Sequence, residues 1–369
     1  MSPSALRTGG LALDIGAASV RVLRLTGAPG RVKLRDYLEA PLPDALVVDG
    51  EIVDADLFAR ELRPFVKRWG LRGRAVQVGV SNQKVIVRSI EMPEMTEEEM
   101  RGALEYQAQD FIPIPLEEAV IDFQVLGPRT GSDGTRRLEV LLVAAQRQMI
   151  EVLLESLRRS GLKVAGIDIC GLALVRALLP RSSSLASLAE PEACRGIADV
   201  SSSVSTLVVA QGGTLKFSRV INFSSDRFVR VVSERRGIPL TDAAMLVEQI
   251  GLQGPPAIAG ELYSSEVVEE TRQQLTRMAT ELSGEIKRSF DYYQSQEHGM
   301  PVSELILSGQ GALIPNLDSH LSDALGIPVS IADPLTQVAQ NASRLSDAEL
   351  ARMAPCLSVL IGLALPEGD

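Results

Sequence analysis

The chain has 369 residues, about two and a half times the ~150 expected of one domain, so we expect at least two hydrophobic cores. Hydrophobic residues make up 45% and charged residues 23%, which excludes a largely disordered chain, while aromatic residues at 4% argue against base stacking on single-stranded nucleic acid. The formal net charge is −10, so no overall basic field would draw the protein to nucleic acid or to anionic lipid.

The cysteines and histidines do not form a metal-binding or disulfide pattern. Cys170, Cys194 and Cys356 are odd in number and have no close spacing, so a reducing compartment is the simpler interpretation. His298 and His320 have no neighbouring ligand residues and are expected to be ordinary surface residues. A serine hydrolase is poorly supported because the sequence has no G-x-S-x-G motif.

No segment is expected to enter a membrane directly. The first ten residues do not match a signal peptide, and the apolar run 356–365 is shorter than the ~20 residues that cross a bilayer. The same run lacks a basic flank with which to lie on a membrane surface. We therefore expect a soluble protein that reaches a membrane only through a partner.

Two similar hairpins are predicted half a chain apart. Residues 11–15 predict a buried strand that runs into a turn of small residues and then a second strand, in which Arg21 would face outward. The pattern of strand, aspartate, turn and strand at Asp14 returns at Asp199. Two such units suggest two homologous lobes, with a Ser- and Pro-containing linker at 180–191.

An α/β block lies between the hairpins, at about residues 82–160. Thr96 and Glu99 have the spacing of a capping box at the start of one helix, and another helix ends at Gly161. In the second half of the chain, apolar residues recur every three or four positions over 268–293, which predicts one long helix.

Hairpins of this kind suit phosphate binding. A tight turn of small residues presents backbone N–H groups to phosphate oxygens, and an aspartate at the strand end can orient the waters of Mg²⁺. Two facing hairpins would hold a polyphosphate from both sides, and the loop 308–312 would let the backbone approach a nucleoside. Each hairpin alone also fits a purely structural turn, so the order of the elements is more informative than any one of them.

Several longer stretches are specific enough to indicate a family. They are LALDIGAASVRVLRL, PLPDALVVDGEIVD, SNQKVIVRSIEMPEMTEEEMRGALEYQAQDFIPIPLEEAVIDFQVLG, LLVAAQRQMIEVLLESLRRSGLKVAGID, EIKRSF, LILSGQGALIPNL and APCLSVLIGLAL. Over about residues 10–365 the sequence resembles the PilM family of actin-like proteins of type IV pilus assembly, which is related in fold to the cell-division protein FtsA.

This resemblance implies an α/β fold of the actin-like ATPase type, with two lobes around a nucleotide cleft and an inserted subdomain. The first lobe would comprise residues 8–81 and 161–190 together with a C-terminal helix at 346–365. The inserted, peptide-binding subdomain would be 82–160, and the second lobe 195–345.

The resemblance also implies ATP and Mg²⁺ as cofactors, with Asp14 and Asp199 as the catalytic and metal-binding residues. The nucleotide would be bound by the two hairpins, the adenosine loop and a flanking helix, through Asp14, Gly16, Ser19, Asp199, Ser202, Ser205, Glu285, Lys287, Ser289, Gly309, Gln310 and Gly311. Ser201 and Gln310 stand where the family usually has glycine, and Ser203 where it has an acidic residue. These departures would weaken nucleotide binding, so at most a slow ATPase is expected.

The partner implied by the resemblance is the N-terminal cytoplasmic tail of the inner-membrane protein PilN, with other pilus platform proteins as further partners. The residues that match the family's peptide groove are Ser81, Asn82, Arg88, Phe111, Pro113 and Pro115. Phe111 fits a core anchor equally well, and the two prolines fit helix terminators.

The expected function is therefore a nucleotide-binding adaptor on the cytoplasmic face of the inner membrane. The alternative is a structural scaffold of the same machine whose degenerate cleft does not hydrolyse ATP. A small-molecule kinase is less favoured because no catalytic carboxylate can be nominated. A self-anchoring filament protein would need a basic amphipathic C-terminal helix, whereas the tail formed by the last six residues is short and acidic.

Overall fold

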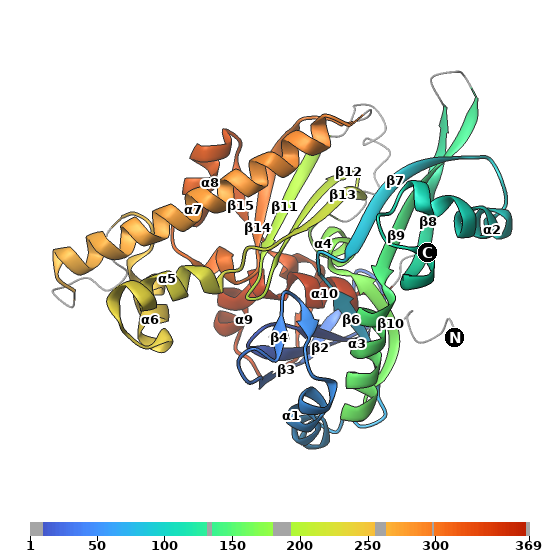
Figure 1. The fold of residues 1–369 in the computed structure, drawn as a ribbon. Helices are drawn as coiled ribbons and strands as arrows, with labels where there is room; N and C mark the ends of the chain where they lie inside the picture. The colour runs from blue at the N-terminus through green and yellow to red at the C-terminus, as the bar shows by residue number, and fades with distance from the viewer. Residues whose placement is uncertain (1–9, 131–134, 180–192, 255–262, 297–298, 367–369) are drawn as a thin grey trace.

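The computed structural model of the protein describes residues 10–130, 135–179, 193–254, 263–296 and 299–366, and it contains three main sheets with helices packed on them (Figure 1). The linker predicted at 180–191 and His298 lie outside these described residues. The mixed α/β architecture agrees with the predicted fold class.

The first sheet is built around the predicted N-terminal hairpin. Its strands lie in the order β10–β6–β1–β2–β3–β16, with β1 antiparallel to β2 and parallel to β6. Their bounds are β1 Leu11–Ile15, β2 Ser19–Thr26, β3 Lys33–Pro41, β6 Ala75–Val80, β10 Lys163–Ile169 and β16 Gln340–Asn341. A short hairpin, β4 Val47–Val48 with β5 Glu51–Ile52, follows β3.

Both faces of this sheet are covered. Successive side chains of β1 point to opposite faces, and each face has its own core cluster. Leu13 packs in one cluster with α1 (Ala55–Arg68) and α3 (Arg147–Ser160). Ala12 packs in another cluster with α4 (Cys170–Leu178) and α10 (Ser358–Ala364). The central strands of the sheet are therefore buried on both sides.

The second sheet repeats the topology of the first. Its order β13–β12–β11–β14–β15 corresponds to β3–β2–β1–β6–β10, which confirms the predicted internal repeat. The strands are β11 Cys194–Val200, β12 Ser205–Gln211, β13 Thr214–Ile221, β14 Val302–Ser308 and β15 Val329–Ile331. In each sheet the hairpin strand that carries the aspartate runs parallel to the strand on its other side.

Helices α5, α6, α7 and α8 accompany the second sheet. Their bounds are α5 Asp226–Arg236, α6 Leu240–Ile250, α7 Ser265–Gln294 and α8 Leu317–Leu325. The predicted long helix is confirmed as α7, which buries Leu275, Leu282 and Ile286 against the sheet and runs along the upper left of Figure 1.

A third, three-stranded sheet lies to the right in Figure 1 and has the order β7–β9–β8. Its strands are β7 Val85–Pro93, β8 Ala119–Thr130 and β9 Arg136–Gln146, and α2 (Glu97–Gln107) packs on one face. The predicted capping box is present, with Thr96 and Glu99 bonded to each other's backbone N–H at the start of α2. We refer to this unit as the inserted sheet.

Helix α3 was expected within the inserted block at 82–160, and it packs in the core of the first sheet. Leu153 and Leu157 of α3 lie in one cluster with Phe58 and Leu62 of α1. The amphipathic pattern of α3 explains this packing, because its apolar face is buried against α1 and the strands of the first sheet. The full division of the chain into lobes stays a prediction.

The predicted C-terminal helix at 346–365 is instead three segments: α9 Asp347–Met353, a 3₁₀ turn at Ala354–Leu357, and α10. Pro355 lies in the turn, where it cannot supply the backbone N–H that a continuous helix needs. In the described residues no helix is both long and apolar enough to cross a membrane.

The contact between α10 and α4 leaves no room for a side chain at Gly362. A Cβ there would lie 1.9 Å from the carbonyl oxygen of Ala173, which is backbone and cannot move aside cheaply. We expect Gly362→Ala to lower the free energy of unfolding by about 2–3 kcal/mol, as overpacked core substitutions do.

The matched control is Gly102→Ala in α2, where a Cβ would meet nothing within 4 Å. It should raise stability by about 0.5–1 kcal/mol, because alanine favours a helix over glycine. Urea unfolding measures both variants. Equal stabilities for the two would contradict the tight helix crossing.

Candidate functional site

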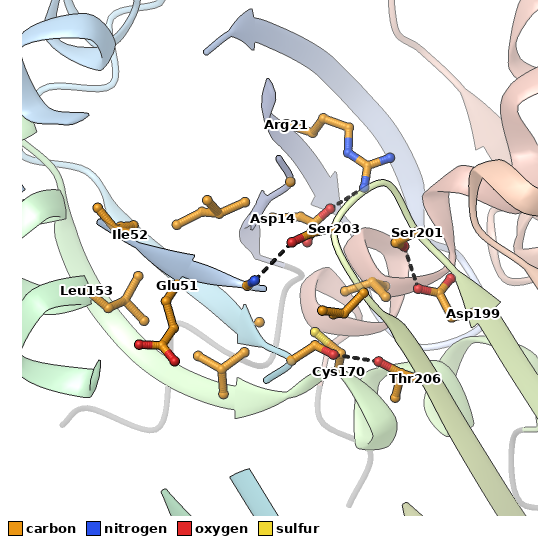
Figure 2. Close-up of a pocket in the computed structure, with 18 of the residues that line it drawn as sticks. Asp14, Arg21, Glu51, Ile52, Leu153, Cys170, Asp199, Ser201, Ser203 and Thr206 are labelled. Carbon is orange, nitrogen blue, oxygen red and sulfur yellow. Dashed lines mark hydrogen bonds and ion pairs between the residues drawn. The ribbon is translucent and has the colours of Figure 1, made fainter. Parts of the chain in front are cut away.

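A pocket opens between the ends of the two aspartate-bearing hairpins (Figure 2). We call it the central cleft. Residues from the first sheet, the β4–β5 hairpin, α3, α4 and the second sheet line it: Asp14, Ile15, Gly16, Arg21, Gly50, Glu51, Ile52, Gly79, Val80, Ser81, Met149, Leu153, Cys170, Asp199, Ser201, Ser203, Val204, Thr206 and Val359. The topology thus brings Asp14 and Asp199 to one place, as the repeat predicted.

Asp14 is held by an internal cation. Arg21 stands directly opposite it in the β1–β2 register, and the two side chains form an ion pair with 14% and 7% exposure. Arg21 Nη1 also donates to the carbonyl of Cys356, at 3.2 Å. Burial acts to lower the pKa of the Arg21 guanidinium, but the charges of Asp14 and other neighbours outweigh it and raise the pKa.

The prediction that Arg21 faces outward is therefore wrong. Strand alternation separates an inner from an outer face only where one side of a sheet meets water. Here β2 lies inside the first sheet with β1 and β3 on its edges and α10 against it. Its residues from Val20 to Leu23 are all buried.

Asp199 is buried and fully bonded by hydroxyl groups. Ser308 Oγ donates to Asp199 Oδ1 at 2.8 Å, and Ser201 Oγ donates to Oδ2 at 2.7 Å. Burial raises the pKa of Asp199, the two hydroxyl donors oppose that rise, and the nearby charge of Asp14 adds to it. The carboxyl group is thus positioned by the second sheet rather than left free in the cleft.

Direct contacts join the two sides of the central cleft. The backbone N–H of Gly50 donates to Ser203 Oγ at 2.9 Å, and the hydroxyls of Ser81 and Thr206 lie 2.6 Å apart. Gly16 and the Ser202 side chain are so close that a Cβ on Gly16 would lie 2.9 Å from Ser202 Oγ. The serine-rich turn therefore packs against the first hairpin.

The predicted adenosine loop packs against the end of β11. Gly309 has a φ of +79°, and a Cβ there would lie 2.6 Å from the carbonyl oxygen of Val200. Its N–H donates to the carbonyl of Pro355, which also lies 3.0 Å from Ser308 Oγ. Gln310 Oε1 is buried and has no hydrogen-bond partner among the described residues. Glycine at 309 is thus required by the fold itself.

Several predicted nucleotide-binding residues do not line the central cleft and bond elsewhere. Ser19 Oγ donates to Glu39, and Ser205 Oγ donates to the carbonyl of Phe223. On α7, Ser289 is buried and donates to the Glu285 carbonyl, the Glu285 carboxylate pairs with Arg288, and Lys287 is exposed. Their role toward a nucleotide stays a prediction.

Both predicted Mg²⁺ ligands have partners in this arrangement. Arg21 pairs with one oxygen of Asp14, and two serines bond Asp199, so Mg²⁺ or its waters would compete with these contacts. Their role toward the metal stays a prediction. Among the described residues no three acidic, histidine or cysteine side chains group as metal ligands would. His320 is half-buried on α8, away from the two aspartates, and burial lowers its pKa.

The residues predicted to bind a partner fall into two groups. Ser81 lines the central cleft, and Asn82 is buried, donating to the Asp49 carbonyl and accepting from the Lys84 N–H. Arg88 lies on β7, Phe111 packs in the cluster of the inserted sheet, and Pro113 and Pro115 are exposed. The first group therefore lies at the central cleft, before β7 begins, and the second belongs to the inserted sheet.

Sequence reasoning missed Arg21, Thr206 and the β4–β5 hairpin as parts of the site. Glu51, which lines the cleft, forms an ion pair with Lys84 at 2.8 Å and so links this hairpin to the start of β7. A basic residue directly opposite Asp14 in a short hairpin is the one signal that was available in the sequence.

The repeat of two sheets around a cleft defines an actin-like fold, and solved structures agree. The protein is similar to a structure described as a PilM–PilN type IV pilus biogenesis complex, with a TM-score of 0.78 and 24% identity over 97% of this chain and 98% of that one. It is also similar to MreB5 of Spiroplasma citri bound to ADP, with a TM-score of 0.51 and 14% identity over 98% and 95% of the two chains.

Sequence comparison gives the family. Residues 12–367 match the model of the type IV pilus assembly protein PilM, so the chain belongs to that family. FtsA of Bacillus subtilis is 24% identical over 362 residues, covering 88% of this chain and 78% of FtsA. FtsA of Streptococcus pneumoniae is 22% identical over 353 residues, covering 87% and 75%. The predicted family and fold are thereby confirmed.

The Asp14–Arg21 pair should behave as a buried ion pair. Arg21→Met leaves a buried carboxylate without its partner, and we expect a loss of about 3–5 kcal/mol in the free energy of unfolding. Asp14→Asn with Arg21→Met removes both charges and should recover much of that loss. Urea unfolding of both single variants and the double variant measures the coupling; purely additive effects would contradict it.

The raised pKa of Asp199 predicts a pH dependence of stability. Between the ordinary aspartate pKa of about 3.9 and the raised value, the folded state binds more protons than the unfolded state, so stability falls as pH rises. Asp199→Asn lacks this loss and should gain stability relative to the natural protein from pH 4 to pH 7. Parallel stability curves for the two proteins over this range would refute the assignment.

Proposed function

We propose that this protein is a cytoplasmic, actin-like adaptor of type IV pilus assembly, and that it binds the N-terminal tail of a PilN-like inner-membrane protein on the inserted sheet. The family match over residues 12–367 supports a role in type IV pilus assembly. The likeness to a PilM–PilN complex supports a PilN-like protein as the partner. Peripheral membrane association would then come through that partner, with other platform proteins as further contacts.

The observation that carries the tail site is the setting of Arg88. In the inserted sheet Arg88 pairs with Leu142, which pairs with Phe123, so all three share the face that α2 covers. Ile86 and Ile90 flank Arg88 on this face. The half-buried guanidinium has no hydrogen bond or ion pair within the described part of the chain.

A half-buried cation without a partner favours a ligand that brings acceptors. An extended peptide tail carries backbone carbonyl groups, and its apolar side chains suit the isoleucines beside Arg88. The exposed Pro113 and Pro115 border the same cluster, in the turn where Phe111 is anchored. This arrangement would let a short tail dock without rearranging the sheet.

Titration of the N-terminal peptide of the PilN-like protein tests this site. Arg88→Ala should weaken binding by tenfold or more, because hydrogen bonds to charged groups contribute about 1.5–3 kcal/mol. The matched control is Arg136→Ala, an exposed arginine on β9 of the same sheet, which should bind the peptide as the natural protein does. Equal affinity of the Arg88 and Arg136 variants, or no binding by the natural protein, would reject the proposal.

The central cleft favours the second candidate, a scaffold that does not turn ATP over. Support comes from the Gly50–Ser203 and Ser81–Thr206 contacts across the cleft and from the occupied carboxylate of Asp14. A nucleotide would have to separate these groups before its phosphates reached the hairpin turns. Nucleotide binding as the family resemblance implies it therefore stays the competing proposal.

Titration of a fluorescent ATP analogue with Mg²⁺ separates the two candidates. The scaffold predicts no saturable binding to the natural protein, because the contacts across the cleft and the ion pair of Asp14 compete with the phosphates and the metal. A saturable signal that Asp14→Ala abolishes would instead favour the nucleotide-binding adaptor. Tail binding is measured separately, so either result leaves that part of the proposal standing.

A further inference from the structure

The surface formed by α1, the loop to β6 and the end of α3 carries a concentration of positive charge. Residues 60–74 and 155–163 contain nine lysines and arginines against two glutamates, in a chain whose formal net charge is −10. These segments are the C-terminal half of α1, the loop to β6, the last turn of α3 and the start of β10. The acidic balance of the whole chain therefore hides a local reversal of sign.

Hydrogen bonds join these segments into one surface. Arg63 on α1 donates to the carbonyl of Arg159 on α3, at 3.0 Å. The N–H of Gly73 donates to the Gly161 carbonyl, and the N–H of Lys163 donates to the Arg74 carbonyl. In Figure 1, α1 lies at the bottom of the molecule with the lower end of α3 beside it. The cations thus gather on one side of the protein.

Six of these cations lack an acidic partner and are exposed. Arg158 and Arg159 pair with Glu155, and Arg60 lies 3.7 Å from Glu61. No carboxylate of the described residues is within ion-pair distance of the other six, which we call the basic patch: Arg63, Lys67, Arg68, Arg72, Arg74 and Lys163.

Helix electrostatics explain only part of the basic patch. Cations in the last turn of a helix are stabilised by its dipole, which accounts for Lys67 and Arg68 on α1. Arg63, Arg72, Arg74 and Lys163 lie outside any last helical turn. Gathering like charges without counter-ions costs stability, so an anionic partner is the simplest reason for the arrangement.

Aromatic side chains lie at the edge of the basic patch. The rings of Phe65 and Trp69 are 5.7 Å apart, and the Arg68 guanidinium lies 4.9 Å over the Phe65 ring. Both rings are half-buried, so each still presents a surface to the outside. Arginines and lysines beside a tryptophan are the combination that favours the interface of an anionic bilayer.

We propose that the basic patch is an electrostatic contact surface for an anionic phospholipid bilayer. The occupant is the lipid surface itself, held by several cations at once with no inserted segment. This inference goes beyond the proposed adaptor and does not require tail binding. Helix α3 spans the distance from the inserted sheet to the basic patch, about 20 Å for its 14 residues. Binding through the patch would therefore fix the orientation of the inserted sheet relative to the membrane.

Vesicles of 70% phosphatidylcholine and 30% phosphatidylglycerol are the probe, in co-sedimentation with the full chain at 50 mM NaCl. The natural protein should bind them, should fail to bind pure phosphatidylcholine, and should be released at 500 mM NaCl by screening. Each cation near such a surface strengthens binding about fivefold, so Arg72→Gln, Arg74→Gln and Lys163→Gln together should weaken it by ~100-fold.

The matched control changes net charge by the same amount elsewhere. Arg31, Arg277 and Arg344 are exposed and form no ion pair within the described residues, and their joint substitution by glutamine should leave vesicle binding unchanged. Equal losses in the two triple variants would overturn the proposal, as would no binding by the natural protein at low salt.

Two further arms exclude other anionic partners. A DNA duplex or a polyglutamate peptide that binds as tightly as the vesicles at equal ionic strength would show that the partner is a different polyanion, and the membrane assignment would be wrong. Binding of the PilN-like tail by the patch variant should be unaffected, which keeps this test apart from that of the tail site.

Discussion

The organisation of the molecule depends on one buried ion pair at the junction of its two halves. Asp14 ends the first strand and Arg21 stands opposite it, so the charge that the first hairpin would offer to a ligand is already matched by its own sheet. Charges buried this deeply persist only when paired and hydrogen-bonded. The second hairpin satisfies its aspartate in a different way, with the hydroxyls of Ser201 and Ser308.

The 3₁₀ turn at 354–357 links these two arrangements. The Cys356 carbonyl accepts from Arg21 of the first sheet, while the Pro355 carbonyl accepts from the Gly309 N–H beside the second. The break in the predicted C-terminal helix is therefore useful to the fold, because it exposes carbonyl groups to both sheets. Direct contacts from Gly50 to Ser203 and from Ser81 to Thr206 then bridge the cleft.

Local patterns in the sequence predicted the elements well, because these patterns are set by neighbours in the chain. The capping box at Thr96, the left-handed Gly161 that ends α3 and the apolar stripe of α7 each follow from spacing alone. The repeat of Asp14 and Asp199 likewise predicted two related sheets. The arrangement of the cleft was beyond this reasoning, because the contact from Gly50 to Ser203 joins residues 153 positions apart.

Charge gave the least reliable guidance. The net charge of −10 excluded an overall basic field, yet it carried no information on how charges are distributed over the surface, and α1 with the end of α3 reverses the sign locally. Likewise Arg21 looked like an outward-facing residue until the sheet order placed β2 between two strands and under α10. Both errors came from treating as local a property that only the tertiary fold determines.

The distance across the cleft shows whether protein contacts hold the two halves together without a ligand. Spin labels at Val53→Cys and Leu240→Cys, with Cys356→Ser, would report it by pulsed electron resonance, since Val53 and Leu240 are 65% and 48% exposed and Cys170 and Cys194 are buried. The account predicts one narrow distance distribution for the ligand-free protein. A broad or two-peaked distribution that narrows only when ATP and Mg²⁺ are added would contradict it.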